Sequence, residues 1–384
     1  MPLELEARGV VSDAAARIDS ERIAFFDGLY RLQSGDILCG YTVGSMKHCP
    51  KGTIRFSRST DGGETWSEIP FKFDSVLDGV PGSLAGAELA EVSPGRLLLV
   101  TTWFDRSDPA KPLFDPVTEG ILHSKLLMAV SEDHGVTWGP WQPIQTPGLT
   151  GVALTGPWLV LPNGTLGLAF ESFKEFDDPS PARHGAWLLC THDGGHTFDV
   201  PYCVGQDPQD AVYYWDQRVV AVPPQVEGAG NDEYVALFWT HHRKDKHDLK
   251  VHFLKSRLRG THADMQPVET TIPGQIAAPY VARDGGIFGF VVDRDHPGTM
   301  TLWQSRDDGA TWPDADKLIV YTHQVKDAVS QGKENVDFAQ YWEDMGKWSF
   351  GHPAIIGLDD DHVLVSYYAG TPQRMSIHWA RVRI

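Results

Sequence analysis

Apolar residues along the chain fall into short runs that polar turns interrupt, and this rhythm returns six times. In the first copy, a run at 25–32 leads through a turn at 33–36 into a more apolar run at 37–43. The other copies span the segments 88–102, 157–170, 219–239, 280–292 and 354–368. Apolar runs of this length, bounded by Gly, Asn, Asp and Pro, predict β-hairpins rather than helices.

A second pattern, an octapeptide that ends in an aromatic residue, occurs four times between these hairpins. Its copies are 59–66, 131–138, 191–198 and 305–312, with the consensus Ser/Thr-x-Asp-x-Gly-x-Thr-Trp/Phe. In such a turn the Asp carboxylate can accept hydrogen bonds from the amides that follow it, and the Gly can take a positive φ. The aromatic ring is then free to pack between sheets. We call these segments the Asp turns and expect all four Asp residues to be architectural.

The two patterns together predict an all-β fold. Six hairpins, each followed by an outer pair of strands, make six four-stranded antiparallel blades, and recurrence at this interval indicates stacked repeats. The fourth repeat lacks its Asp turn, and the sixth is complete only if 3–11 pairs with 375–384. Such pairing would remove exposed sheet edges. We therefore expect a single domain over 1–384, a six-bladed β-propeller in which the N- and C-terminal strands close the ring.

Four segments are too long to be turns within a blade and are expected on the rim. These insertions are 104–124, 174–184, 243–248 and 320–347. Within the last of them, 327–345 mixes acidic and aromatic residues at near-helical spacing, which predicts a small helical lid. Long structured insertions usually carry function.

Composition and charge narrow the range of partners. The 38 Gly, 26 Pro and 13 Trp among 384 residues suit short strands with tight turns and aromatic contacts. The net charge of −18, from 33 basic and 51 acidic residues, repels phosphate backbones and argues against a nucleic-acid partner. An anionic substrate would need its charge met by a few local Arg or His residues.

The cysteines and the chain start bear on the compartment. Cys39, Cys49, Cys190 and Cys203 lack metal-ligand spacing and are expected to be reduced, with a Cys190–Cys203 bridge as the alternative. The first residues show no basic region followed by an apolar run, and no stretch has the length of a membrane span. We expect no signal peptide and no membrane partner, and a cytoplasmic protein by default, or a secreted one if a leader was removed.

In a propeller, the starts of the innermost strands and the ends of the second strands meet at one mouth of the central channel. Those positions carry carboxylates, imidazoles, arginines and flat aromatic rings, a set that suits the binding of a glycan or sugar substrate. The candidates are Arg22, Asp27, Glu88, Trp103, Asp105, Glu171, Tyr214, Trp215, Asp216, Arg218, His242, Arg243, His352 and Tyr368. Glu171 and Asp216, on adjacent blades, form the best carboxylate pair for acid and base catalysis.

We expect no metal and no other cofactor. His241, His242 and His247 are close in sequence and invite a metal hypothesis. Adjacent residues of a strand point to opposite faces, however, so His241 and His242 cannot readily share one ion.

The four Asp turns and the blade rhythm resemble the Asp boxes of the sialidase (neuraminidase) superfamily over nearly the whole chain. Locally, 155–158 with 162–164 is similar to that family's Gly-Pro-containing inner strand. The resemblance implies a sialidase-like six-bladed propeller and a glycoside hydrolase. In that family three arginines hold the substrate carboxylate, an Asp on a first-blade loop is the acid/base, and a Tyr assisted by a Glu is the nucleophile.

Several of the family's catalytic positions are occupied differently in this chain. Residues 22–24 resemble the family's Arg-Ile-Pro, but counting back from the first turn places Phe26 at that position, and the loop 41–52 contains no Asp. The same counting places Asp216 where the family has the assisting Glu, and His352 where it has the Tyr. Because a neutral imidazole suits proton abstraction or water activation, we expect chemistry other than sialic acid hydrolysis.

Three functions remain open on these residues. The first is a sialidase-like glycoside hydrolase for an acidic or unusual sugar, with Glu171 and Asp216 as the carboxylate pair. In that hypothesis Arg218 and Arg243 hold the substrate, and His352 bonds or deprotonates at the centre.

The second hypothesis is a polysaccharide lyase that abstracts the proton next to a uronate carboxyl. There His352 or His242 would be the base, Tyr214 the acid, and Arg218 would neutralise the carboxylate. The third is a non-catalytic module that stacks glycans on aromatic residues, namely Trp103, Trp215 and Tyr368. An enzyme is favoured, because inward-facing charged groups cost solvation energy that stacking alone would not require.

Overall fold

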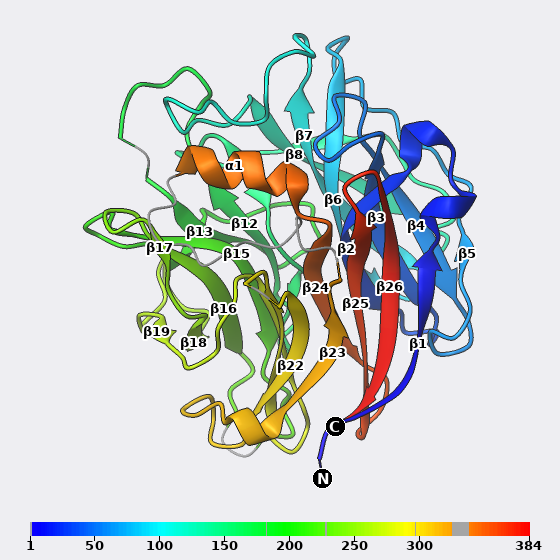
Figure 1. The fold of residues 1–384 in the computed structure, drawn as a ribbon, viewed down its shortest axis with the longest axis vertical. Helices are drawn as coiled ribbons and strands as arrows, with labels where there is room; N and C mark the ends of the chain where they lie inside the picture. Colours follow the sequence, from blue (N-terminus) through cyan, green and yellow to red (C-terminus); the bar gives the residue numbers. More distant parts are fainter. Residues whose placement is uncertain (1, 182, 227–228, 296, 325–337) are drawn as a thin grey trace.

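Residues 2–181, 183–226, 229–295, 297–324 and 338–384 are described by a computed structural model, and within them the chain is built almost entirely from β-strands. Figure 1 shows the sheets arranged around a common centre, with helix α1 (Phe338–Lys347) in the upper half of the view. Three short 3-10 turns are η1 (Ala14–Ala16), η2 (Asp19–Glu21) and η3 (Asp314–Asp316). Of the predicted insertion at 320–347, residues 325–337 lie outside the described residues, whereas α1 occupies its end and overlaps the segment 327–345 in which a small helix was predicted.

The largest sheet contains both the first and the last strands of the chain. Its first half comprises β2 (Ile23–Arg31), β3 (Ile37–Gly44), β4 (Thr53–Ser59) and β5 (Ser67–Glu68). Its second half comprises β24 (Phe350–Gly357), β25 (His362–Thr371), β26 (Arg374–Arg383) and β1 (Glu4–Ser12). Neighbouring strands within each half are antiparallel, and a single parallel pair, Ile23 with Met375, joins the two halves.

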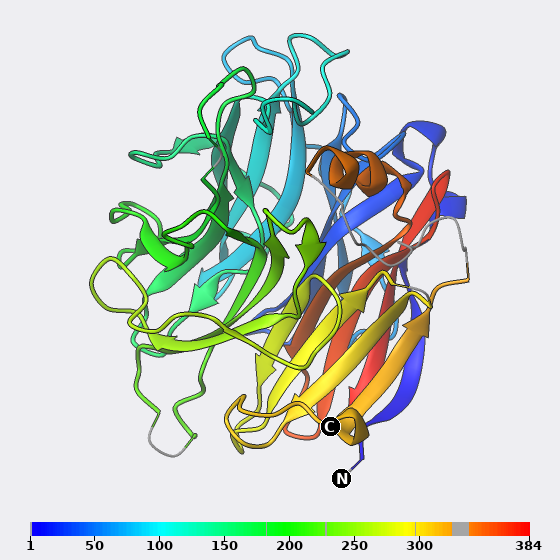
Figure 2. The ribbon, with the colours of Figure 1, turned by 60° about the vertical axis from the view of Figure 1, so that its left-hand side comes forward.

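The predicted pairing of the N-terminal segment with the C-terminal strand is present. β1 runs antiparallel to β26, from Glu4 opposite Arg383 to Ser12 opposite Ile377. The two chain ends therefore lie side by side, at the end of the molecule away from α1 (Figures 1 and 2).

Four further antiparallel sheets follow in chain order between these halves. The first has β6 (Gly82–Ser93), β7 (Arg96–Asp105), β8 (Ser124–Ser131) and β9 (Gln142–Ile144). The second has β10 (Val152–Leu154), β11 (Leu159–Val160), β12 (Leu166–Ser172), β13 (Gly185–Thr191) and β14 (Tyr202–Gly205). The third has β15 (Val212–Ala221), β16 (Glu233–His242), β17 (His247–Asp248), β18 (His252–Arg257) and β19 (Val268–Glu269). The fourth has β20 (Ala277–Val281), β21 (Ile287–Asp293), β22 (Thr299–Ser305) and β23 (Lys317–Thr322).

The inner strands are enclosed on both faces because the sheets pack against one another. Every residue of β3 and of β12 is buried, which explains why the second run of each predicted hairpin is nearly continuous in apolar residues. The first strands also contact one another or strands of the next sheet. β2 contacts β6 and, within the largest sheet, β24; β10 contacts β6; β15 contacts β11 and β12; and β20 contacts β15 and β24. The four cysteines are free and buried. None of the described helices is long and apolar enough to cross a membrane.

The Asp turns form the hydrogen bonds that their sequence predicts. In the first, Asp61 Oδ1 accepts from the amide of Thr65 at 2.9 Å and Asp61 Oδ2 from the Thr65 hydroxyl at 2.5 Å, while Ser59 Oγ accepts from the amide of Gly63 at 2.8 Å. Gly63 has φ +94°. The Thr65 bonds lower the pKa of Asp61 to about 2. The same contacts recur around Asp133, Asp193 and Asp307, so each carboxylate is engaged within its own turn.

Trp138, which closes the second Asp turn, anchors the packing between two sheets. Its ring is 9% exposed and stacks on Phe56 at 5.8 Å. We predict that Trp138→Ala lowers the free energy of unfolding by about 3 to 5 kcal/mol, because it leaves a cavity between sheets. Val136→Ala, on the 48% exposed side chain of the same turn, should change it by less than about 0.5 kcal/mol. Denaturant melts of both variants test this, and equal midpoints would refute it.

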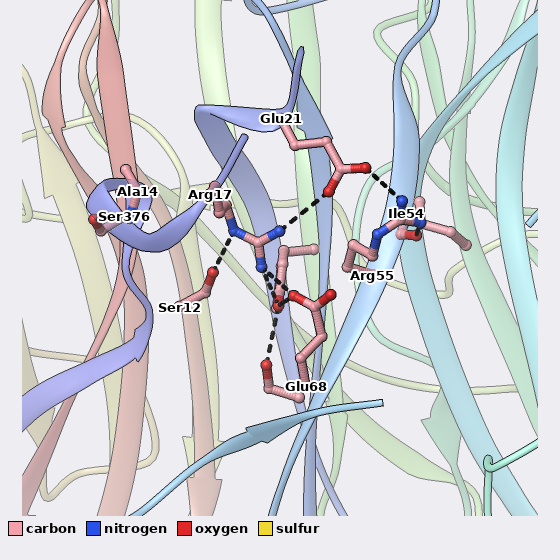
Figure 3. Close-up of polar contacts among 10 residues, drawn as sticks. Ser12, Ala14, Arg17, Glu21, Ile54, Arg55, Glu68 and Ser376 are labelled. Carbon is pink, nitrogen blue, oxygen red and sulfur yellow. Dashed lines mark hydrogen bonds and ion pairs between the residues drawn. The ribbon is translucent and has the colours of Figure 1, made fainter. Parts of the chain in front are cut away.

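A polar network pins the segment that crosses from β1 to β2 (Figure 3). The Arg17 guanidinium donates to Ser12 Oγ at 2.7 Å, to the Tyr41 hydroxyl at 2.6 Å and to Glu68 at 2.7 Å. Glu21 bridges Arg17 and Arg55. The crossing segment is thereby tied to β3 and β5 as well as to β1.

Arg17→Ala should destabilise the fold by about 2 kcal/mol, because the substitution removes hydrogen bonds to a charged, largely buried group. Arg283→Ala is the matched control, since Arg283 pairs with Asp360 and both side chains are at least 66% exposed. The control should lower the unfolding free energy by less than about 0.5 kcal/mol. Equal losses for the two variants, measured by urea denaturation, would contradict the anchoring role.

Candidate active site

One pocket opens where the first strands converge, with about 830 Å³ of empty volume including its mouth. Its polar lining consists of His48, Glu88, Thr102, Thr155, Glu171, Asp216 and His352. Its apolar lining includes Phe26, Phe104, Leu113, Phe114, Ile121, Phe173, Trp215, Trp239 and Met345. The carboxyl groups and His352 form what we call the floor of the pocket, and Leu113, Phe114 and Ile121, with Phe104 and Phe173, form its apolar wall.

Four of the strands that form the floor share an unusual backbone feature. β2, β6, β15 and β24 each contain a register shift, and within it lies a pocket residue with positive φ. These residues are Phe26 (φ 52°), Gly86 (φ 74°), Asp216 (φ 45°) and His352 (φ 57°). Left-handed backbone is costly for residues other than Gly, by about 1 to 3 kcal/mol each, and such strain gathers at functional sites. Each bulge also changes which face of the strand the following side chains occupy, so strict alternation along the sequence does not predict those faces.

Glu171 on β12 and Asp216 on β15 lie against each other on the floor of the pocket. The backbone amide of Asp216 donates to Glu171 Oε2 at 3.3 Å. Burial, with the neighbouring charge of Asp216, raises the pKa of Glu171 well above its usual value. Burial raises the pKa of Asp216 too, but Arg218 and Arg294 oppose that rise. The pair therefore has one carboxyl that favours its protonated form and one that nearby cations help to ionise.

Arg218 is the cation at the centre of the site. It is 2% exposed and lines a second cavity of about 350 Å³ beneath the pocket, together with Asp27 and Glu88. Its charge lowers the pKa values of Asp27, Glu88, Glu171 and Asp216, which burial raises. The arginine thus balances carboxyl groups drawn from four different strands.

The contacts of His352 define its protonation state. Arg218 Nη2 lies 2.7 Å from His352 Nε2, and since arginine only donates, Nε2 accepts. His352 Nδ1 therefore carries the proton and donates to the Asp27 carbonyl at 2.9 Å. Burial and the charge of Arg218 hold the pKa of His352 well below its ordinary value. A neutral imidazole whose lone pair accepts from Arg218 does not suit the role of proton-abstracting base that the sequence suggested.

Asp27 lies behind the floor, fully buried in the second cavity. Ser366 Oγ donates to its Oδ2 at 2.5 Å, and burial raises its pKa to about 8. Its protonated form therefore stabilises the fold at low pH, and this stability is lost as the pH rises toward 8.

Replacement of Asp27 by Asn should remove this pH dependence. Relative to Asp27→Asn, the wild type should lose up to about 1.4 kcal/mol of unfolding free energy for each pH unit between pH 5 and 7.5. Thermal melts of both proteins across that range measure the difference. Parallel curves would show that the Asp27 carboxyl does not hold its proton there.

The structure brings together about half of the predicted site residues. Glu88, Glu171, Trp215, Asp216 and His352 line the pocket, and Asp27 and Arg218 line the cavity beneath it.

Two aromatic candidates point away from the pocket, because neighbouring residues at a strand start or end face opposite sides of the sheet and the prediction was based on position along the strand alone. Trp103 donates through Nε1 to the Ser75 carbonyl at 2.8 Å, while its neighbours Thr102 and Phe104 face the pocket. Tyr214 packs against Phe238 at 5.4 Å in the interior of its sheet, so it cannot be the acid of a lyase. A one-residue slip moves a side chain to the other face of a strand.

Five other candidates lie outside the pocket for different reasons. Arg22 caps η2 near β26, and Asp105 accepts from the Ser107 amide in a groove on the rim. The remaining three have partners elsewhere: His242 pairs with Asp245 at 3.0 Å, Arg243 pairs with Glu119 at 3.5 Å, and Tyr368 accepts from Lys47 at 2.7 Å. The predicted role of Arg243 in holding substrate therefore does not fit its position.

Loop 45–52 brings residues that the sequence analysis did not single out. Lys47 Nζ donates to the Met345 carbonyl at 3.2 Å, and His48 Nε2 lies 3.1 Å from Met345 Sδ, so the loop holds the end of α1 beside the pocket. Burial, with the charge of Lys47, lowers the pKa of His48 to about 3, which keeps it neutral. No local sequence pattern indicates the contact of this loop with a helix nearly 300 residues away.

The hydrophobic wall comes from the predicted insertion at 104–124. Phe114 bridges to Ile121 within it, and Ile121 bridges to Glu175 of the next insertion. Phe114 and Phe173 meet at 5.2 Å. The two insertions thus join into one wall.

No protein-family model matches the chain, and no curated protein sequence matches it. Several solved structures, however, are similar to it in fold. A protein of unknown function from Dyadobacter fermentans superposes with TM-score 0.70 at 18% identity, over 100% of this chain and 99% of that one. The Hadza microbial sialidase Hz136 gives TM-score 0.66 at 16% identity, over 99% and 69% of the two chains. An α-L-arabinanase from Penicillium chrysogenum, in complex with arabinobiose, gives 0.60 at 15% identity, over 98% of both.

Likeness at this level of identity establishes the fold alone. The chain has the fold of propeller sialidases, with antiparallel sheets of four or five strands, and the resemblance seen in the sequence is confirmed at that level. Among the described residues, no group of three or more His, Cys, Asp and Glu side chains is placed to hold a metal ion.

Proposed function

We propose that this chain is a sialidase-like glycoside hydrolase, organised as one six-bladed propeller domain over 1–384. The pairing of β1 with β26 and the contacts between successive first strands support a ring closed by the chain termini. In such a ring the pocket lies at one mouth of the central channel. The likeness to sialidases and to an arabinanase supports the class of reaction.

The observation that carries the proposal is the Glu171–Asp216 pair on the floor of the pocket. Glu171, with its strongly raised pKa, donates a proton to the glycosidic oxygen as the bond to the anomeric carbon breaks. Asp216, whose ionised form the charges of Arg218 and Arg294 favour, acts as the carboxylate that attacks the anomeric carbon or takes a proton from the attacking water. Water is consumed overall, and both groups return to their starting protonation states.

Arg218 and His352 support this pair without reacting. Arg218 favours the ionised form of Asp216, and His352 keeps Arg218 in place through the bond to its Nη2. The Asp216 backbone, held at φ 45° within a bulge, directs the residue toward Glu171.

The lyase hypothesis gains no support from these contacts, because His352 Nε2 accepts from Arg218 and Tyr214 packs within its sheet. The alternative is a module that binds glycans without catalysis, because Trp215 and Trp239 offer aromatic surface in the same pocket. The experiment below distinguishes it from a hydrolase.

Glu171→Gln and Asp216→Asn should each lower turnover of a glycoside by at least about 100-fold, because each removes a proton donor or carboxylate from the reaction. Neither should lower the melting temperature, since both replace a buried ionisable group with a neutral one of the same shape. The matched control is Glu132→Gln, whose side chain is 70% exposed and pairs with Arg96. Release of reducing ends from a panel of glycans and aryl glycosides measures activity.

Wild-type turnover in either floor variant would remove that residue from the mechanism. Appearance of an unsaturated uronide, seen by its ultraviolet absorbance, would indicate a lyase. Saturable sugar binding without any turnover would indicate the binding module.

A further inference from the structure

Carboxyl groups line the pocket, and its described lining includes no cationic Lys or Arg side chain. Among its described lining residues there is no Lys or Arg, whereas Glu88, Glu171 and Asp216 all face it. The histidines His48 and His352 are neutral, because burial and neighbouring cations lower the pKa of each. A ligand in the pocket therefore meets hydroxyl, imidazole and carboxyl groups, and meets no positive charge at the surface.

The nearest cations are engaged behind the lining. Arg218 donates to His352 and lies among carboxyls, and Lys47 donates to the Tyr368 hydroxyl at 2.7 Å. Arg294 lies flat over the Trp348 ring at 4.1 Å and, like Arg218, is 2% exposed. None of these three cations lines the pocket, and both arginines are 2% exposed, so a substrate carboxylate would have to pass through the lining to reach a counter-charge.

A charged sugar therefore fits this pocket poorly. An anionic group in the pocket would lose its hydration without meeting a counter-charge in the lining, and the ionised Asp216 of the proposed mechanism would repel it in a medium of low dielectric constant. The hydroxyls of an uncharged sugar can instead donate to the ionised carboxyls and accept from the protonated ones.

The wall opposite the carboxyls adds a second requirement. Leu113, Phe114 and Ile121 from one insertion, with Phe104 and Phe173, present an apolar surface to the pocket. Aliphatic and aromatic surface of this kind gains free energy by covering apolar groups rather than hydroxyls.

From these observations we infer that the site takes an uncharged sugar that carries an apolar group, such as an aryl or acyl substituent, and excludes uronic and sialic acids. The inference rests on the proposed hydrolase function for its catalytic readout. The sequence analysis allowed an acidic sugar because it expected Arg218 and Arg243 to face the substrate. Neither arginine lines the pocket, so the inferred substrate is uncharged instead.

The test uses matched substrate pairs with purified full-length protein. Each p-nitrophenyl hexoside of the gluco and galacto series, in both anomers, is compared with the p-nitrophenyl uronide that differs only in its carboxylate, alongside an aryl sialoside. The uncharged member of a pair should have kcat/KM at least ~100-fold above its uronide. A uronide or sialoside hydrolysed as well as its uncharged counterpart, with activity lost in Glu171→Gln, would overturn the inference and leave the hydrolase intact.

Binding separates the remaining outcomes. If no compound is hydrolysed, the hydrolase proposal fails for this panel, and saturation-transfer NMR of the same compounds decides the inference alone. Binding of the uncharged member of a pair in preference to its uronide supports it. Preferred binding of the uronide, or binding of neither, overturns it.

The apolar wall is tested by Leu113→Ser, which removes a half-buried side chain from the rim of the pocket. This variant should raise KM, or the dissociation constant in the NMR assay, for p-nitrophenyl glycosides by about tenfold and leave methyl glycosides unchanged. Val117→Ser, on a side chain of the same insertion that is 87% exposed, is the control. Equal effects of Leu113→Ser on aryl and methyl glycosides would refute the placement of the apolar group.

Discussion

The burial of one guanidinium among carboxyl groups from separate sheets is the constraint on which the centre of this molecule depends. Arg218 lies within electrostatic reach of Asp27 on β2, Glu88 on β6 and Glu171 on β12, and it shares a strand with Asp216. A charge removed from water is costly unless it is well compensated. Arg218 comes within reach of Asp27, Glu88 and Glu171 only when their strands converge on β15, so the assembly of the sheets also determines the electrostatics of the site.

Backbone strain is concentrated at the same place. Three residues with side chains, Phe26, Asp216 and His352, hold left-handed conformations within bulges of three different strands, and Gly86 holds one in a fourth. Packing of the sheets on either side must supply the energy that these conformations cost. A feature repeated in four strands is better explained as a way to aim backbone and side chains into the pocket than as separate accidents of packing.

The fold was largely readable from the sequence, whereas the site was readable only in part. The hairpins, the Asp turns and the pairing of β1 with β26 follow from local patterns of apolar and turn residues. Trp103 and Tyr214 were chosen from their place at strand ends, and which face each side chain takes depends on strand bounds and bulges that the sequence does not show. The contact of loop 45–52 with α1 depends on segments far apart in the chain, and no periodicity records it.

The interleaving of β1 with the last numbered strand has a consequence for biosynthesis. β26 lies between β25 and β1, and it comes after every other numbered strand in the chain. During translation β1 therefore has no strand to pair with until β26 has left the ribosome. A nascent product that stops short of β26 would keep two bare strand edges, and such edges invite pairing with other chains.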